Sequence, residues 1–167
     1  MNSKLQVSIT SLIADSSHLA GCFSAKACAD PLFNSFVWQN TWWNKWGSRL
    51  NAVIVLVKDG DCDGVICSLP LYVEKFRFKK IIPIKRLQFI GTNYQNLATP
   101  RAEYLAFVEA PSRKSQINVA LDHLVPVEWN EFVARDIVRG ASTDLALTQW
   151  ASRNGWGSRE IHQDVAY

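Results

Sequence analysis

Two apolar, β-branched runs on either side of an Asp-Gly pair constrain the fold of this chain most strongly. The first run covers residues 52–57 and the second covers residues 64–73, and Asp59-Gly60 follows the first run closely. Asp-Gly between two hydrophobic runs is a strong signal for a β-hairpin, and a run without polar alternation is typical of a strand buried on both faces. The sequence therefore predicts a hairpin of two buried strands.

Periodicity predicts further elements around this hairpin. Polar and apolar residues alternate over 5–9, whereas aromatic residues recur at helical spacing over 35–46, with Asn34 or Ser35 as N-cap and Gly47 as C-cap. The remaining expected strands are 87–91, 104–108, 129–137 and a last one from Trp156 onward, and the remaining expected helices are 15–28, 115–124 and 143–154. This order predicts one domain over residues 1–167, with a mixed sheet and helices on its faces, in an α/β or α+β fold.

Composition narrows the class of protein. The chain has 167 residues, of which 48% are hydrophobic and 20% charged, so it is expected to fold rather than stay disordered. No segment approaches the ~20 apolar residues of a membrane span, and residues 1–14 lack the apolar core of a signal peptide. We therefore expect a cytoplasmic protein without a membrane span. The net charge of +3 does not by itself imply nucleic-acid binding.

The cysteines do not predict a metal site. None of the spacings among Cys22, Cys28, Cys62 and Cys67 gives the C-x₂-C pattern that structural zinc sites favour. Cys67 lies inside an apolar run, where a free thiol behaves as a small hydrophobe. We expect it to be buried and inert.

Five short motifs follow one another in the middle of the chain. They are residues 30–38 (Asp-Pro-Leu-Phe-Asn-Ser-Phe-Val-Trp), Trp42-Trp43 with Gly47, residues 63–65 with 69–72 (Leu-Pro-Leu-Tyr), residues 86–91 with Tyr94, and residues 128–132 leading to Asp136-Ile137. In this order they resemble the N-terminal half of CelD-like acetyltransferases, which are associated with cellulose or exopolysaccharide biosynthesis. The resemblance covers Pro31 to about Ile137.

This resemblance implies a GNAT-like fold with a largely antiparallel sheet. CelD-like proteins look like relatives of the FemAB transferases, which consist of two GNAT-like halves with acyl-CoA chemistry in the C-terminal half. The present sequence stops at Tyr167, about where the linker to that half would begin. It has no Arg/Gln-x-x-Gly-x-Gly/Ala loop for a cofactor pyrophosphate, and its closest glycines, Gly155 and Gly157, follow a predicted helix. We expect no catalytic residue and no cofactor in this chain.

Candidate ligand-binding residues lie in two regions and in one strand motif. Trp38 and Trp42 belong to the tryptophan-rich helix, whose rings either pack in the core or at a domain interface, or stack in part on a sugar or another flat ligand. Tyr94 and Arg101 lie in a polar loop after the strand 87–91, and the resemblance implies that this loop lies near an acceptor cleft. The alternative there is an ordinary turn with a packed tyrosine. Tyr72 closes the Leu-Pro-Leu-Tyr motif and completes the candidates.

A basic segment follows the second apolar run. Its cations alternate in part with phenylalanines, which places several of them on one face of a strand. Either the segment is a solvated hairpin with charged edges, or it binds an anionic partner such as nucleic acid or a membrane surface. The six cations are Lys75, Arg77, Lys79, Lys80, Lys85 and Arg86.

Three functional hypotheses follow from the sequence. The first is a non-catalytic GNAT-like domain that binds an acceptor or assembles with a catalytic GNAT-type partner or with a second copy of itself. The second is an interaction module that uses residues 75–86 to bind an anionic partner. The third is an acyl-CoA-dependent N-acyltransferase that works as a homodimer with acetyl-CoA and needs a cofactor loop that the sequence does not show.

Overall fold

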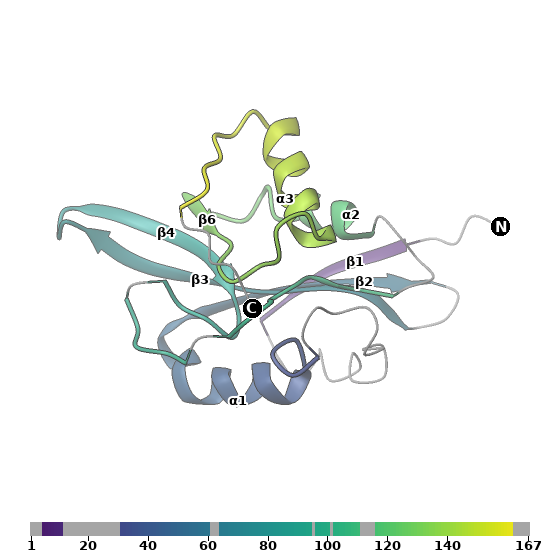
Figure 1. Ribbon diagram of the computed structural model, residues 1–167, viewed down its shortest axis with the longest axis horizontal. Helices are drawn as coiled ribbons and strands as arrows, with labels where there is room; N and C mark the ends of the chain where they lie inside the picture. Colours follow the sequence, from purple (N-terminus) through teal and green to yellow (C-terminus); the bar gives the residue numbers. More distant parts are fainter. Residues whose placement is uncertain are drawn as a thin grey trace.

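The computed structural model describes residues 5–11, 31–60, 64–94, 96–100, 102–110 and 116–161 (Figure 1). The expected helix 15–28 lies outside these residues, as do Arg101 and three of the four cysteines. In chain order the elements are β1 (Leu5–Thr10), α1 (Phe36–Trp46), the short 3₁₀ helix η2 (Gly47–Arg49), β2 (Asn51–Asp59), β3 (Val65–Phe78), β4 (Ile82–Phe89), β5 (Val108–Glu109), α2 (Gln116–Asp122), β6 (Glu131–Val133) and α3 (Ser142–Arg153).

The strands form one six-stranded sheet that is largely antiparallel. Its order is β1-β2-β3-β4-β6, and β5 pairs with β3 in addition. The pairs β1–β2, β2–β3, β3–β4 and β3–β5 are antiparallel, whereas β6 runs parallel to β4 with Leu87 opposite Phe132. The expected mixed sheet and the predicted hairpin of buried strands are both confirmed.

Helices cover the sheet from both sides, with α1 below it and α2 and α3 above it in Figure 1. Successive residues of a strand face opposite sides, so β2 and β3 contribute to two separate cores. Leu69, Leu71 and the fully buried thiol of Cys67 belong to the larger core with α2 and α3. Tyr72 and Trp42 belong to the smaller core with α1. The expected burial of Cys67 is therefore confirmed.

The predicted strand 104–108 is wrong over most of its length, because only β5 at its end is extended and paired. Tyr104 has a φ of 54°, which a strand does not allow. The backbone N–H groups that follow donate to side chains: Ala106 N donates to Asn34 Oδ1 (2.8 Å) and Phe107 N donates to Thr143 Oγ1 (2.9 Å). These groups have no need of a strand partner.

The two last predicted strands also differ from the structure. Only Glu131–Val133 of the segment 129–137 is a strand, and Asp136, with a φ of 58°, turns the chain away from the sheet. Residues 156–161 form no strand. Instead Trp156 packs its ring edge to face against Trp129 and Trp150, with centroids 4.9 and 4.8 Å apart.

Within the described ranges, no helix combines the length and the apolar character needed to cross a membrane.

Candidate functional site

The parallel strands β4 and β6 end side by side, and polar residues gather where they end. In open sheets with parallel strands, ligands bind beyond the carboxyl ends of those strands. The chain leaves β4 through Gly91, whose φ of 114° favours glycine, and continues to Asn93. It leaves β6 toward Arg135, which donates from Nη1 to the backbone oxygen of Asn93 (3.2 Å). This hydrogen bond joins the segments that follow β4 and β6.

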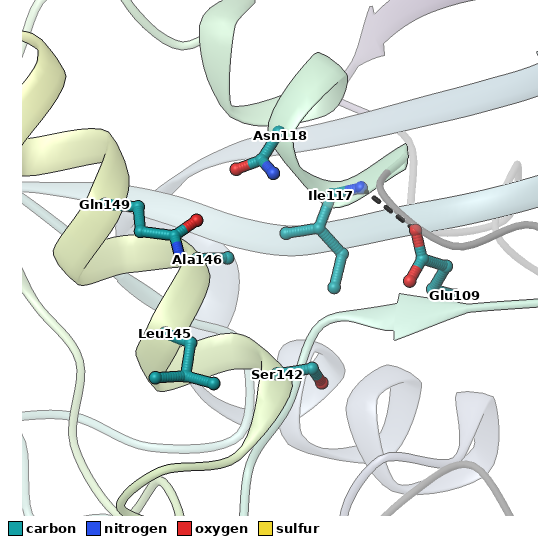
Figure 2. Close-up of a pocket in the computed structure, with 7 residues that line it drawn as sticks. All are labelled: Glu109, Ile117, Asn118, Ser142, Leu145, Ala146 and Gln149. Carbon is teal, nitrogen blue, oxygen red and sulfur yellow. Dashed lines mark hydrogen bonds between the residues drawn. The ribbon is translucent and has the colours of Figure 1, made fainter.

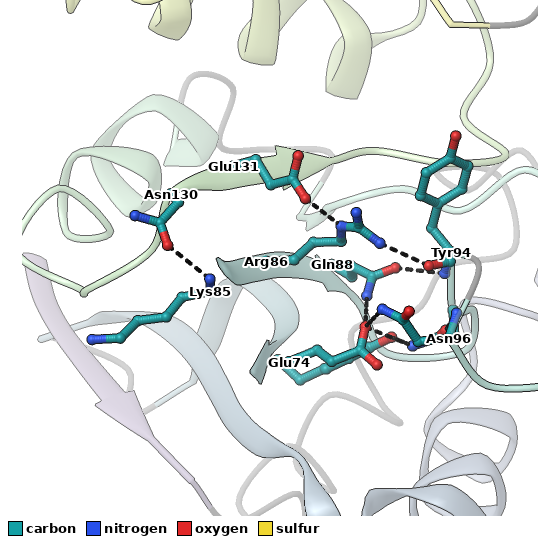
Figure 3. Close-up of polar contacts among 10 residues, drawn as sticks. Glu74, Lys85, Arg86, Gln88, Tyr94, Asn96, Asn130 and Glu131 are labelled. Atoms are coloured by element: carbon teal, nitrogen blue, oxygen red, sulfur yellow. Dashed lines mark hydrogen bonds and ion pairs between the residues drawn. The ribbon is translucent and has the colours of Figure 1, made fainter. Parts of the chain in front are cut away.

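Glu74 is the centre of this region, which we call the β4–β6 polar site (Figure 3). The residue is 6% exposed. One oxygen, Oε2, accepts hydrogen bonds from Gln88 Nε2 (3.0 Å), Asn93 Nδ2 (3.2 Å) and Asn96 Nδ2 (3.1 Å). No described residue donates to the other oxygen. A buried carboxylate needs such donors, because its desolvation is otherwise expensive.

Asn93 organises the loop after β4. Its Oδ1 accepts from the backbone N–H groups of Asn96 (3.1 Å) and Leu97 (2.8 Å), while its Nδ2 also donates to the Tyr72 hydroxyl (3.0 Å). Tyr72 in turn donates to the backbone oxygen of Thr92 (2.8 Å). Burial raises the pKa of the Tyr72 hydroxyl well above its ordinary value, so this tyrosine is a neutral structural group. Hydrogen bonds of the Tyr72 and Asn93 side chains therefore fix the conformation of the loop.

Arg86 joins the polar site to β6 and is 6% exposed. It donates from Nε to Glu131 Oε1 (2.6 Å) and from Nη1 to the backbone oxygen of Tyr94 (2.8 Å). The guanidinium also lies over the rings of Phe76 and Tyr94, at 4.4 and 5.0 Å from their centroids. The Tyr94 hydroxyl points away from these contacts (Figure 3). Arg86 is thus part of the interior rather than of the basic surface.

The tryptophan candidates lie under the same end of the sheet. Trp42 is 1% exposed and packs on Tyr72, with centroids 5.5 Å apart. Trp38 is half-buried against Phe33 and adjoins Gly91. Trp42 and Tyr72 therefore offer no accessible ring surface, whereas Trp38 and Tyr94 remain candidates for ligand contact. Arg101, the fifth candidate, is outside the described residues.

A hollow with a volume of about 370 Å³ lies between α2 and α3, away from the β4–β6 polar site (Figure 2). Glu109 from β5 lines it, and its Oε1 accepts hydrogen bonds from the backbone N–H groups of Gln116 and of Ile117 (3.3 Å for Ile117). A carboxylate thus caps the first turn of α2, where such groups are stabilising. The cap and the polar side chains of Asn118 and Gln149 make this hollow partly polar.

The sequence interpretation missed Glu74, Gln88, Asn93 and Arg135. Two of them carried a readable signal. Glu74 follows seven consecutive buried residues, and Gln88 stands between Leu87 and Phe89, so each is a polar side chain inside an apolar strand. Such residues need internal partners and are therefore site candidates. Asn93 and Arg135 lie in loops, and only the pairing of β4 with β6 brings them together.

No cluster of His, Cys, Asp or Glu in the described ranges is arranged to hold a metal ion. No protein-family model matches this chain, and no curated protein sequence matches it either.

Proposed function

We propose that this chain is a non-catalytic GNAT-like domain that binds an acceptor at the β4–β6 polar site and assembles through its sheet with a second domain. The mixed, largely antiparallel sheet with helices on both faces is the architecture that the resemblance to CelD-like proteins implied. Three features of the described residues support the three parts of this proposal.

The Glu109 cap is the observation that carries the non-catalytic part. A pyrophosphate bound at a helix N-terminus needs free backbone N–H groups and a positive local potential. The first helix after β4 is α2, and its Gln116 and Ile117 N–H groups already donate to Glu109. The same carboxylate would repel a phosphate. This cap supports the proposal that α2 does not hold the pyrophosphate of an acyl-CoA cofactor.

Glu74 supports acceptor binding. Its Oε2 is fixed by three amide donors, while its Oε1 has no donor among the described residues. A carboxylate held in this way is ready to accept a hydrogen bond from an amine or a hydroxyl group without losing side-chain freedom. The acceptor is thus expected to present such a group.

The open edge of β6 supports assembly. Ile90 N donates to Pro70 O of β3 (2.9 Å), so residues 85, 87 and 89 of β4 face β6. With Arg86 opposite Glu131 and Gln88 opposite Val133, residues 131 and 133 bond to β4 and the N–H group of Phe132 points to the opposite edge. No described strand pairs with that edge. Unpaired strand edges recruit further strands, so a second copy or a partner domain can extend the sheet here.

Calorimetric titration with acetyl-CoA tests the first part. We expect no binding heat up to millimolar cofactor. Micromolar binding would overturn the non-catalytic assignment and favour a homodimeric N-acyltransferase.

Light scattering combined with hydrogen exchange tests assembly. We expect a concentration-dependent dimer, with exchange of the Phe132 N–H group slowing as the dimer forms. A monomer at all concentrations, or a dimer in which this amide exchanges as fast as in the monomer, would exclude self-assembly through β6.

Nuclear magnetic resonance titration tests acceptor binding. Small primary amines and polyols are expected to shift the side-chain amide signals of Asn93 and Asn96. Glu74→Gln should abolish these shifts, and Glu103→Gln, an exposed carboxylate elsewhere, should preserve them. Shifts that persist in Glu74→Gln would exclude Glu74 as the acceptor contact.

A further inference from the structure

The β3–β4 hairpin extends beyond the helices that cover the rest of the sheet (Figure 1). We call residues 74–86 the arm. Glu74 pairs with Arg86 at its base and Phe78 pairs with Ile82 next to its turn. The last pair lies four positions along each strand from the base, a distance of roughly 13 Å.

The arm has one apolar face and one basic face. Phe76 opposite Ile84 and Phe78 opposite Ile82 share the face on which Arg86 and Glu74 lie. Lys75 lies opposite Lys85 and Arg77 opposite Pro83 on the other face. The sequence pattern predicted this separation for the cations of β3.

Apolar side chains are most exposed at the turn itself. Phe78 is 50%, Ile81 75% and Ile82 52% exposed. Single exposed apolar residues are normal on soluble proteins, but three neighbours on a projecting tip mark an interaction site.

The turn presents two lysines in an unfavourable backbone conformation. Lys79 and Lys80 have φ angles of 48° and 63°, and Ile81 N donates to Phe78 O (3.1 Å), which defines a tight hairpin turn. Asn-Gly is the preferred pair in turns of this kind, because both positions are left-handed. The two lysines therefore place positive charge at the tip although the left-handed conformation is unfavourable for them.

The ion pairs of the arm lie at its base, whereas Lys79 at the tip lies over the Phe78 ring, 5.6 Å from its centroid. Lys85 pairs with Glu128, and Arg86 pairs with Glu131. Lys85 also lowers the pKa of the Glu128 carboxyl. No described residue forms an ion pair with any of the four other cations, which are Lys75, Arg77, Lys79 and Lys80.

We propose that the arm binds an anionic phospholipid bilayer, with Phe78, Ile81 and Ile82 inserted at the boundary between headgroups and acyl chains and Lys79 and Lys80 among the headgroups. Peripheral proteins insert apolar groups about 5–10 Å deep, and each nearby cation adds attraction to anionic lipid. A nucleic acid would use the basic face but leave the isoleucines of the tip in water, whereas a bilayer accommodates both. This inference does not depend on the acceptor or on acyl-CoA.

Vesicle flotation with the full chain tests the proposal. We expect binding to phosphatidylcholine vesicles that contain about one third phosphatidylserine, weak binding to pure phosphatidylcholine, and a decrease with salt. Lys79→Asn/Lys80→Gly removes both tip charges while favouring the turn, and should weaken binding roughly 25-fold, about fivefold per lysine. Ile81→Ser should weaken it roughly tenfold.

The matched control is Lys45→Gln/Arg49→Gln, which removes two exposed cations from the end of α1 and from η2. It should bind within about twofold of the wild type, since neither cation belongs to the arm that contacts the bilayer in this proposal. Equal losses in this control and in the tip variant would overturn the proposal. Absence of vesicle binding together with salt-dependent binding of random-sequence duplex DNA would also overturn it and would assign the arm to nucleic acid.

Discussion

Replacing Glu74 by glutamine tests whether one carboxylate holds the loop after β4. Hydrogen bonds to a charged acceptor contribute about 1.5–3 kcal/mol and neutral ones about 0.5–1.5, so each of the three amide bonds to Oε2 should lose about 1 kcal/mol. Burying a neutral glutamine side chain also costs less free energy than burying a carboxylate, which offsets about 1 kcal/mol of this loss. We therefore expect Glu74→Gln to lower the free energy of unfolding by about 2 kcal/mol.

Urea denaturation followed by tryptophan fluorescence measures this change. Glu103→Gln is the control, since that side chain is exposed, and it should stay within about 0.5 kcal/mol of the wild type. Hydrogen exchange at Asn96 and Leu97, whose N–H groups donate to Asn93, should accelerate in Glu74→Gln alone. If Glu74→Gln is as stable as the wild type or more stable, the carboxylate does not anchor the loop and the reasoning is refuted.

Three other changes have defined outcomes. Lys79→Asn/Lys80→Gly should raise the free energy of unfolding by about 1–2 kcal/mol in urea titrations, because it relieves two left-handed lysines; a loss of stability would contradict the turn geometry. Gly91→Ala should destabilise by about 2 kcal/mol, since its φ of 114° disfavours any side chain, and an unchanged melting temperature would exclude that conformation. Burial raises the pKa values of the Cys67 thiol and the Tyr72 hydroxyl. Each group therefore contributes fully to the free energy of unfolding below its ordinary pKa, about 8.5 for cysteine and about 10 for tyrosine. The contribution declines as the pH rises past that value. Urea titrations between about pH 8 and 11 should show a slope of roughly 1.4 kcal/mol per pH unit for each group, and Cys67→Ala should remove the earlier part of the decline.

The regular elements were predictable because their signals are local. The apolar runs that became β2 and β3, and the aromatic spacing that became α1, depend only on neighbours in sequence. Ser35, one of the two predicted N-caps, accepts from Trp38 N (3.2 Å) and caps α1 as expected. Gly155, with a φ of 68°, ends α3 as expected.

The irregular segments were not predictable because distant side chains determine them. Asn34 is not the cap of α1; it is fully buried, and its amide donates to Tyr104 O (2.9 Å) as well as accepting from Ala106 N. These bonds hold the segment 104–107 out of the sheet although its apolar sequence resembles a strand. The polar site was likewise hidden, since the register of Glu74 opposite Arg86 becomes known only once β3 and β4 are paired.

The bonds of Asn34 also bear on how the chain folds. The meander from β2 to β4 joins strands that are neighbours in sequence, so it closes only short loops. The Asn34 bonds join residues 70 and 72 positions apart, and the paired strands β4 and β6 are separated in the sequence by β5 and α2. Contacts of such separation raise the contact order and form late, so the meander should provide the folding nucleus and the β4–β6 polar site should be completed last. The region with the most specific chemistry would then also be the first to open by local unfolding.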